Sequence, residues 1–284
     1  MNFHAKEIMQ FTHLSIRVVN LARSKEYYEN VIGLSVLEES DNQVVFTVDN
    51  HTPLLTIISP EGLKAKASDE TGLYHFALLL PTRSDLANFL YALTTNGIPY
   101  GASNHLVSEA LYLKDPDGNE IEIYIDKDFN DWKWLDSEVE MASLPLDYYD
   151  IIDEITTKTW TKLPSDTIMG HIHLFAHDLD PMLAFYQDGL GYKLVSRFGN
   201  QAMFLSKADY HHHIAFNTWK GTNTKNQSCD RAGLDYLTLS LKDDQAREDL
   251  ISKLNAANYK TEHINDDYIV YDPEDNKIVI KINE

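Results

Sequence analysis

The sequence is poor in cysteine and in positive charge, and it has no long apolar run. Its single thiol, Cys229, excludes an internal disulfide and indicates a reducing compartment. The 24 Lys and Arg residues against 44 Asp and Glu residues give a net charge of −20, which argues against nucleic acid and anionic membranes as partners. No segment approaches the roughly 20 apolar residues that cross a bilayer, and residues 1–12 lack the pattern of a leader peptide. We therefore expect a soluble, cytoplasmic protein.

What the sequence does contain is an internal repeat. Three segments of the first half recur in the second half in the same order, and the first of them aligns without a gap. The segment pairs are 13–37 with 171–195, 72–80 with 233–241, and 115–119 with 272–276. The two halves of the chain are therefore copies of one unit.

Each half is itself doubled. In the first half, a strand near 12–19 and an amphipathic helix near 22–32 are followed by three short strands. The same order restarts with a strand near 73–80 and a helix near 84–96, and it occurs twice more in the second half. The pattern predicts an α+β fold made of four βαβββ modules.

The modules suggest how the chain is divided. We expect two tandem domains at 1–127 and 167–284, each a curved mixed sheet around a central cavity. The segment 128–166 breaks the repeat and is rich in Asp, Trp and Thr, so it is interpreted as a connecting arm.

Three side chains of the first half suggest a metal site. His13 begins the first strand of the first module, His75 lies early in the first strand of the second module, and Glu122 lies in that module's last strand. Alternation at period two places Glu122 on one face of its strand, opposite Ile121. Two imidazoles and one carboxylate leave three positions open on an octahedral ion, as in non-haem Fe(II) oxygenases. We predict His13, His75 and Glu122 as metal ligands, with packed strand histidines as the alternative.

Four segments carry a resemblance to a known family. They read YHFALLLP at 74–81, HLVSEALYLKDPDGNEIEIY at 105–124, GHIHL at 170–174 and YHHHIAFN at 210–217. The sequence resembles the vicinal oxygen chelate superfamily, which includes glyoxalase I, bleomycin-resistance proteins and extradiol dioxygenases, and within it the bacterial catechol 2,3-dioxygenase group. The resemblance covers nearly the whole chain and implies that His105 and Tyr112 are catalytic and that Glu122 is a metal ligand.

The same resemblance implies a chemistry. Fe(II) would be held by the three predicted ligands, with Mn, Zn or Ni as other possible ions. The substrates would be a small aromatic diol and dioxygen. His105 would donate a hydrogen bond or transfer a proton, and Tyr112 would contact a substrate oxygen. A homo-oligomer is possible but is not needed to complete a site.

The second half departs from this pattern. Glu122 aligns with Val279 and His75 with Tyr236, so that only His171 remains of the aligned set. His171, His211 and His213 form either a second metal site or a structural patch, and the structural interpretation is favoured because degenerate repeats usually become structural.

The first module also departs from the extradiol pattern. Many extradiol enzymes have a further catalytic histidine near the end of the first module's last strand. This chain has Pro60 and Glu61 there.

Two other functions stay open. A glyoxalase-type isomerase or lyase would use the same metal ligands, but it usually needs a fourth protein ligand, and the strand at 53–59 offers only Thr56. A binding protein of the bleomycin-resistance type would enclose an aromatic ligand without chemistry. A carboxylate buried beside two histidines is difficult to explain in such a protein because an unpaired buried charge is costly.

Overall fold

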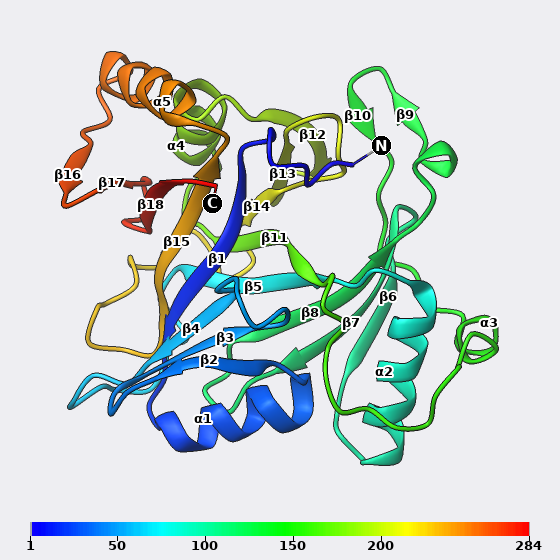
Figure 1. Cartoon of the computed structure of the whole chain (residues 1–284). Helices are drawn as coiled ribbons and strands as arrows, with labels where there is room; N and C mark the ends of the chain where they lie inside the picture. Colours follow the sequence, from blue (N-terminus) through cyan, green and yellow to red (C-terminus); the bar gives the residue numbers. More distant parts are fainter. Residues whose placement is uncertain (1, 284) are drawn as a thin grey trace.

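The computed structural model, which describes residues 2–283, consists of two curved eight-stranded sheets, one two-stranded sheet and the helices that pack around them (Figure 1). The predicted fold class is confirmed, because each of the four repeats is a βαβββ module. None of the helices in this described range is long and apolar enough to cross a membrane.

The first two modules follow one another directly. The first consists of β1 (Gln10–Arg17), α1 (Leu21–Tyr27) with a π-helical turn η1 (Tyr28–Ile32), β2 (Ser35–Glu39), β3 (Gln43–Thr47) and β4 (Leu55–Ile58). The second consists of β5 (Gly72–Leu79), α2 (Arg83–Thr95), β6 (Gly101–Asn104), β7 (Ser108–Lys114) and β8 (Glu120–Asp126).

The connecting arm and the last two modules complete the chain. The arm contains η2 (Phe129–Asp131), β9 (Trp134–Leu135), β10 (Glu138–Val139) and α3 (Tyr148–Ile152). The third module consists of β11 (Ile168–Phe175), α4 (Leu179–Ala184) with η3 (Phe185–Gly189), β12 (Lys193–Phe198), β13 (Ala202–Ser206) and β14 (Ile214–Asn217). The fourth consists of β15 (Gly233–Leu241), α5 (Asp244–Ala256), β16 (Glu262–Ile264), β17 (Asp267–Tyr271) and β18 (Lys277–Ile282).

Modules pair between the two halves of the chain. One sheet has the order β16-β17-β18-β15-β1-β4-β3-β2 and therefore joins the fourth module to the first. The other has the order β12-β13-β14-β11-β5-β8-β7-β6 and joins the third module to the second. In both sheets the junction is antiparallel, between β15 and β1 or between β11 and β5 (Figure 1). The domain boundaries inferred from the sequence stay a prediction, but each sheet takes strands from both sides of the arm.

Local sequence explains where the first helix begins and ends. The Asn20 side chain accepts a hydrogen bond from the Arg23 amide, which caps the first turn of α1. Gly33 follows the π-helical turn with φ of 92°, a left-handed conformation that glycine adopts without steric cost. The predicted helix at 22–32 therefore corresponds to α1 and its π-helical extension.

The central strands separate an apolar face from a polar one. In β11, Ile172 and Leu174 are fully buried in one apolar cluster that includes residues of both sheets. His171 and His173 alternate with them and project to the opposite face, where they line a cavity. Packing of the apolar faces and helices therefore leaves the polar faces available for a site.

Candidate metal centre

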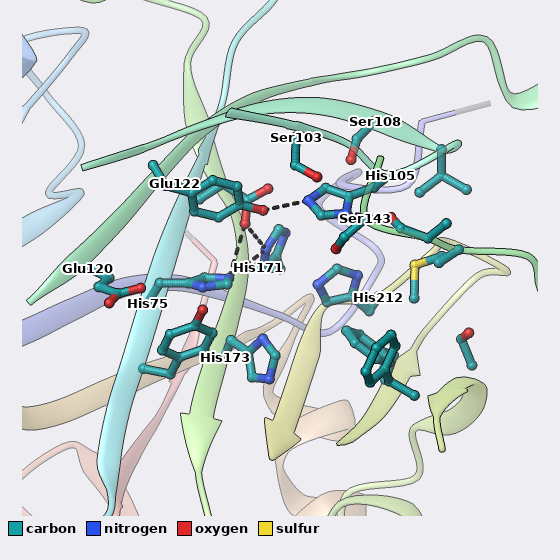
Figure 2. A pocket seen from close by; sticks show the side chains of 18 of the residues that line it. His75, Ser103, His105, Ser108, Glu120, Glu122, Ser143, His171, His173 and His212 are labelled. Carbon is teal, nitrogen blue, oxygen red and sulfur yellow. Dashed lines mark hydrogen bonds and ion pairs between the residues drawn. The ribbon is translucent and has the colours of Figure 1, made fainter. Parts of the chain in front are cut away.

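His75, Glu122 and His171 converge at one point of the sheet formed by the second and third modules (Figure 2). The Nε2 atoms of His75 and His171 lie 3.1 Å and 3.2 Å from Oε2 of Glu122, and 3.3 Å from each other. All three side chains are at most 5% exposed. Three donor atoms on three strands thus form a nearly equilateral triangle inside the protein.

Strand register places the three residues. His75 on β5 lies opposite His173 on β11, and Ala77 lies opposite His171. On its other side β5 runs parallel to β8, which pairs Ala77 with Glu122. The small alanine therefore lies between the carboxylate and one imidazole, and the second imidazole is two residues away on the same face.

A bulge at Gly170 adjusts the strand that carries His171. The register between β11 and β5 shifts by one residue between Met169 and His171. A Cβ at Gly170 would lie 1.9 Å from the hydroxyl oxygen of Tyr124, which is itself fully buried. Glycine at this position lets Tyr124 of β8 pack against the backbone, with its ring 5.0 Å from that of His171.

Burial and the neighbouring groups set the charges of the cluster. Burial lowers the pKa of His171 to about 4, so its ring is neutral at pH 7 and can offer a nitrogen lone pair to a metal ion. Burial acts to raise the pKa of Glu122, but interactions with His171 and His75 outweigh it and hold that pKa well below its usual range. The site therefore combines an anionic oxygen with a neutral imidazole, the forms that coordinate a cation.

The arrangement fits a divalent ion on two grounds. Donor atoms that bind one ion at about 2.1 Å and at right angles lie about 3.0 Å apart, close to the separations found here. The Nδ1 atoms of His75 and His171 are buried without a hydrogen-bond partner, so neither ring is held in place by its outer nitrogen. A bound cation would explain why the Nε2 atoms of both rings point at the Glu122 carboxylate.

The structure does not bring His13 to this cluster. His13 lies on β1 in the other sheet, where Nε2 is 2.8 Å from the Thr56 hydroxyl and Nδ1 is 3.1 Å from the Thr238 hydroxyl. The prediction of His13 as the third ligand is therefore wrong, and His171 occupies that place. The error follows from the assumption that the first two modules share a sheet, since β5 pairs instead with β11 of the third module.

The predicted catalytic residues His105 and Tyr112 lie beside the cluster. His105 Nε2 is 2.6 Å from the Tyr112 hydroxyl, and its Nδ1 is 2.8 Å from the Ala142 carbonyl oxygen of the arm. Because the carbonyl oxygen only accepts, His105 donates to it from Nδ1, and Nε2 forms the hydrogen bond with the Tyr112 hydroxyl, which also interacts with Glu122. Burial and the Glu122 carboxylate raise the pKa of Tyr112 well above its ordinary value, so the phenol stays protonated.

His212 also lies at the site, although nothing in the sequence selected it from the neighbouring histidines. It precedes β14, it is 7% exposed, and its ring centroid lies 4.0 Å from that of His171. Burial holds its pKa well below the ordinary value. The signal was the HHH run at 211–213, which directly precedes the third module's last strand, as residues 52–54 precede the last strand of the first module.

His211 and His213 do not join His171 in a second metal site. His211 Nε2 is 2.8 Å from a carboxylate oxygen of Asp126, and His213 Nε2 is 3.0 Å from the Phe3 carbonyl oxygen. Among residues 2–283, the single group of side chains with metal-binding geometry is the one at His75. These two histidines therefore bond to neighbouring protein groups, whereas His171, which the favoured interpretation also assigned to a structural patch, belongs to the cluster.

A cavity of about 320 Å³ opens onto the cluster. One end is formed by the histidines, Glu122 and Tyr112, and the remainder is formed largely by aromatic and apolar side chains with several serines. The apolar contributors are Tyr74, Val107, Met141, Phe198, Phe204 and Trp219. Such a volume accommodates a small aromatic molecule with its polar end at the cluster.

The fold and the cluster together define an α+β protein of paired βαβββ modules with a candidate metal centre in one of its two sheets. A model of the Glyoxalase/Bleomycin resistance protein/Dioxygenase superfamily matches residues 10–123 and again residues 168–280. The chain belongs to this superfamily, which confirms the resemblance found in its sequence.

Individual relatives agree with this assignment. The catechol-2,3-dioxygenase of Bacillus subtilis (strain 168) is 38% identical over 275 residues, which cover 96% of this chain and 96% of that protein. The biphenyl-2,3-diol 1,2-dioxygenase 3 of Rhodococcus globerulus is 30% identical over 120 residues, 41% of this chain and 63% of that protein.

Solved structures show the same fold at low identity. A putative dioxygenase from Bacillus subtilis superposes with a TM-score of 0.69 at 14% identity, covering 98% of this chain and 86% of that chain. Glyoxalase I from Zea mays superposes with a TM-score of 0.57 at 16% identity, covering 96% and 92%.

Proposed function

We propose that this protein is an Fe(II)-dependent extradiol dioxygenase that opens the ring of a catechol-like aromatic diol with dioxygen. The observation that carries the proposal is the convergence of His75, Glu122 and His171 at the end of an aromatic cavity, beside the hydrogen-bonded pair His105 and Tyr112. Two His and one carboxylate with open positions is the donor set of non-haem Fe(II) oxygenases. The 38% identical catechol-2,3-dioxygenase supports the same reaction class.

The ion and the protein would divide the work. An Fe(II) ion held by the three ligands would supply the redox chemistry and bring the two substrates together. The aromatic walls of the cavity, Phe204 and Trp219 among them, would hold the diol ring and exclude water. The Tyr112 hydroxyl is placed to contact a substrate oxygen, with His105 fixing its direction through their hydrogen bond.

His212 is the group placed to take a proton from the diol. Its Nδ1 is engaged by His211, whereas Nε2 makes no hydrogen bond to another of residues 2–283 and the ring lines the cavity. A neutral imidazole beside the bound diol suits a general base. This residue would supply the function for which the first module offers no histidine.

The expectations of a cytoplasmic location and of a possible homo-oligomer stay predictions. The experiment below also distinguishes the dioxygenase from a glyoxalase-type isomerase and from a metal-free binding protein. Within the described residues the metal-binding group contains three donors, without the fourth protein ligand that glyoxalases usually provide.

The test is anaerobic reconstitution with Fe(II), followed by catechol and air, with metal content measured on each sample. We expect one ion per chain and a yellow ring-opened product from the wild type, and loss of both in His171→Ala. His13→Ala is the matched control, because it removes a buried histidine at the equivalent position of the other sheet and should keep both metal and product.

Each outcome has a distinct meaning. Metal and product retained in His171→Ala but lost in His13→Ala would overturn the placement of the site. Stoichiometric metal without product from several catechols would refute the dioxygenase proposal, and conversion of a hemithioacetal instead would establish the isomerase. Absence of bound metal, with tight binding of an aromatic ligand, would establish the binding protein.

A further inference from the structure

We propose that Arg197 is a specificity-determining residue that binds a carboxylate group carried by the aromatic diol. The proposal rests on the proposed function, because it takes the two diol oxygens to lie at the metal centre. It deepens that function by naming the substrate class: a catechol with an anionic side chain on the edge of the ring that faces away from the two hydroxyl groups.

The cavity is larger than the ring of an unsubstituted diol requires. A space of about 150 Å³ is enough to enclose benzene in a protein interior, whereas this cavity measures about 320 Å³. Because the metal centre lies at one end, a diol bound there leaves roughly half of the volume beyond its far edge. A substituent on that edge would occupy the remaining space.

The remaining part of the cavity leads from the cluster to solvent along ring side chains. The ring centroid of His173 lies 5.0 Å from that of His75, and the ring of Trp219 lies 5.4 Å from that of His173. Phe198 follows, with its ring 6.3 Å from that of Trp219. The exposed fraction rises from 3% for His173 to 43% for Trp219 and 54% for Phe198. The cavity therefore opens to solvent at Trp219 and Phe198.

Arg197 lies at this outer end. It directly precedes Phe198 on β12, the edge strand of the sheet, and both residues line the cavity. Three inter-strand steps, about 14 Å along the curved sheet, separate β12 from β11, which carries His171. Among the described residues that line the cavity, Arg197 is the only lysine or arginine. A side chain that extends from the diol towards solvent would therefore meet this guanidinium.

The hydrogen-bond donors of the Arg197 guanidinium are not used by the protein. Five of the six arginines donate side-chain hydrogen bonds to other residues, namely Arg17, Arg23, Arg83, Arg231 and Arg247. Within residues 2–283 Arg197 donates none, and its ion-pair partner is Glu138 of the arm, with Nε 3.8 Å from Oε1. The two side chains are 42% and 51% exposed, so this long contact contributes little and a ligand displaces it at low cost.

A carboxylate is the group that fits these donors. The planar fork of N–H groups on a guanidinium matches the two oxygens of a carboxylate and forms paired, charge-assisted hydrogen bonds with them. The acids at the inner end are already matched, because Glu122 belongs to the metal centre and Glu120 lies 2.8 Å from Lys114 Nζ. The carboxylate that competes with a ligand for Arg197 is that of Glu138.

The test measures binding to the full-length protein loaded with Zn(II), by isothermal titration calorimetry. The probes are 3,4-dihydroxybenzoate, 3,4-dihydroxyphenylacetate and 3,4-dihydroxyphenylpropionate, each beside its uncharged primary amide. Zn(II) has no redox chemistry, so the diol is held without being cleaved. Because acid and amide share their shape, the ratio of the two dissociation constants isolates the effect of the charge. We expect at least one acid to bind about 10-fold more tightly than its amide.

Variants assign this preference to Arg197. Arg197→Gln should bring the ratio close to one, whereas Arg197→Lys should retain part of the preference because it keeps the charge without the fork. Lys193→Gln is the matched control: it removes one positive charge from the same strand, but Lys193 does not line the cavity, so the wild-type ratio should remain. Glu138→Gln removes the competing carboxylate and should raise the ratio. Zinc content, measured on each variant, shows that the metal centre is intact.

The outcomes separate this proposal from the function on which it rests. Equal affinities of acid and amide in the wild type at all three side-chain lengths would overturn it, as would tighter binding of the amides. An equal loss of preference in Arg197→Gln and Lys193→Gln, or a lower ratio in Glu138→Gln, would also refute the role of Arg197. A preference that depends on Arg197 in a protein that cleaves no diol when loaded with Fe(II) would sustain the anion site and refute the dioxygenase proposal alone.

Discussion

Replacing His13 with glutamine should make the protein less sensitive to acid without affecting the metal centre. His13 is 8% exposed and lies between the hydroxyl groups of Thr56 and Thr238. Burial, with a smaller contribution from the charge of Lys281, lowers its pKa from 6.5 to about 4. A glutamine at this position can hydrogen-bond to both threonines but does not titrate.

The magnitude follows from the difference between the folded and unfolded pKa values. A histidine whose folded pKa is depressed binds its proton more readily in the unfolded chain, so its contribution to stability is lost as pH falls below 6.5 towards 4. With pKa values of 6.5 unfolded and about 4 folded, the free energy of unfolding should fall by about 2 kcal/mol between pH 7 and pH 5 on account of this residue alone.

The assay is urea denaturation of wild type and His13→Gln at the two pH values, on metal-free protein. Other buried histidines titrate in both proteins, so the difference between the two pH-induced losses isolates His13. The variant should lose about 2 kcal/mol less than the wild type over this range. Equal losses in the two proteins would show that His13 is not held neutral by its surroundings and would refute the reasoning.

Three further predictions concern other positions. Gly170→Ala should destabilise the protein by about 1–3 kcal/mol in urea denaturation, because its Cβ must displace the buried Tyr124 hydroxyl; full stability would refute the close approach. Burial raises the pKa of Asp272 to about 6, so this residue's contribution to the free energy of unfolding is present below pH 3.8 and is lost as pH rises through 6. Between pH 4 and pH 7 the free energy of unfolding of the wild type should therefore fall by about 2 kcal/mol relative to that of Asp272→Asn in the same assay. Tyr112→Phe removes the hydroxyl that forms a hydrogen bond with His105, and it should lower kcat by about 10- to 100-fold in steady-state assays with folding retained. An unchanged kcat would exclude a catalytic role for the phenol.

The repeat in the sequence was sufficient to predict the modules. Helix 22–32 and its terminating Gly33, the turns at 115–119 and 272–276, and the period-two alternation around Glu122 are local features that depend on neighbouring residues. The two turns are equivalent in the structure as well. Asp115 accepts a hydrogen bond from the hydroxyl of Tyr28, in the helical segment of the preceding module, and Asp272 accepts one from Tyr186 in the same way. Local signals of this kind survive without knowledge of tertiary contacts.

The pairing of modules could not be predicted in this way. Whether β5 pairs with β1 or with β11 depends on contacts between segments that are roughly equally apolar, and nothing local to His13 or His171 distinguishes them. Two of the three residues at the cluster were correctly brought together by sequence, because His75 and Glu122 belong to the same module. The third depended on the long-range choice, and the role of His212 depended on it as well, since both reach the site through β11 and its partner β14.

The other sheet shows what the same framework becomes without the carboxylate. In the sheet that contains the candidate metal centre, His171 lies opposite Ala77, which pairs with Glu122. At the equivalent places His13 lies opposite Thr238, which pairs with Val279.

A histidine can remain buried after this loss because it can become neutral and bond to hydroxyl groups, as His13 does with Thr56 and Thr238. A carboxylate has no comparable option at low cost, since its charge must be matched by a cation or by donors. Retention of Glu122 between two histidines on three strands is therefore the part of the pattern that argues most strongly for a bound ion. The other sheet, which has Val279 at the equivalent position, carries no buried charge there that needs a cation.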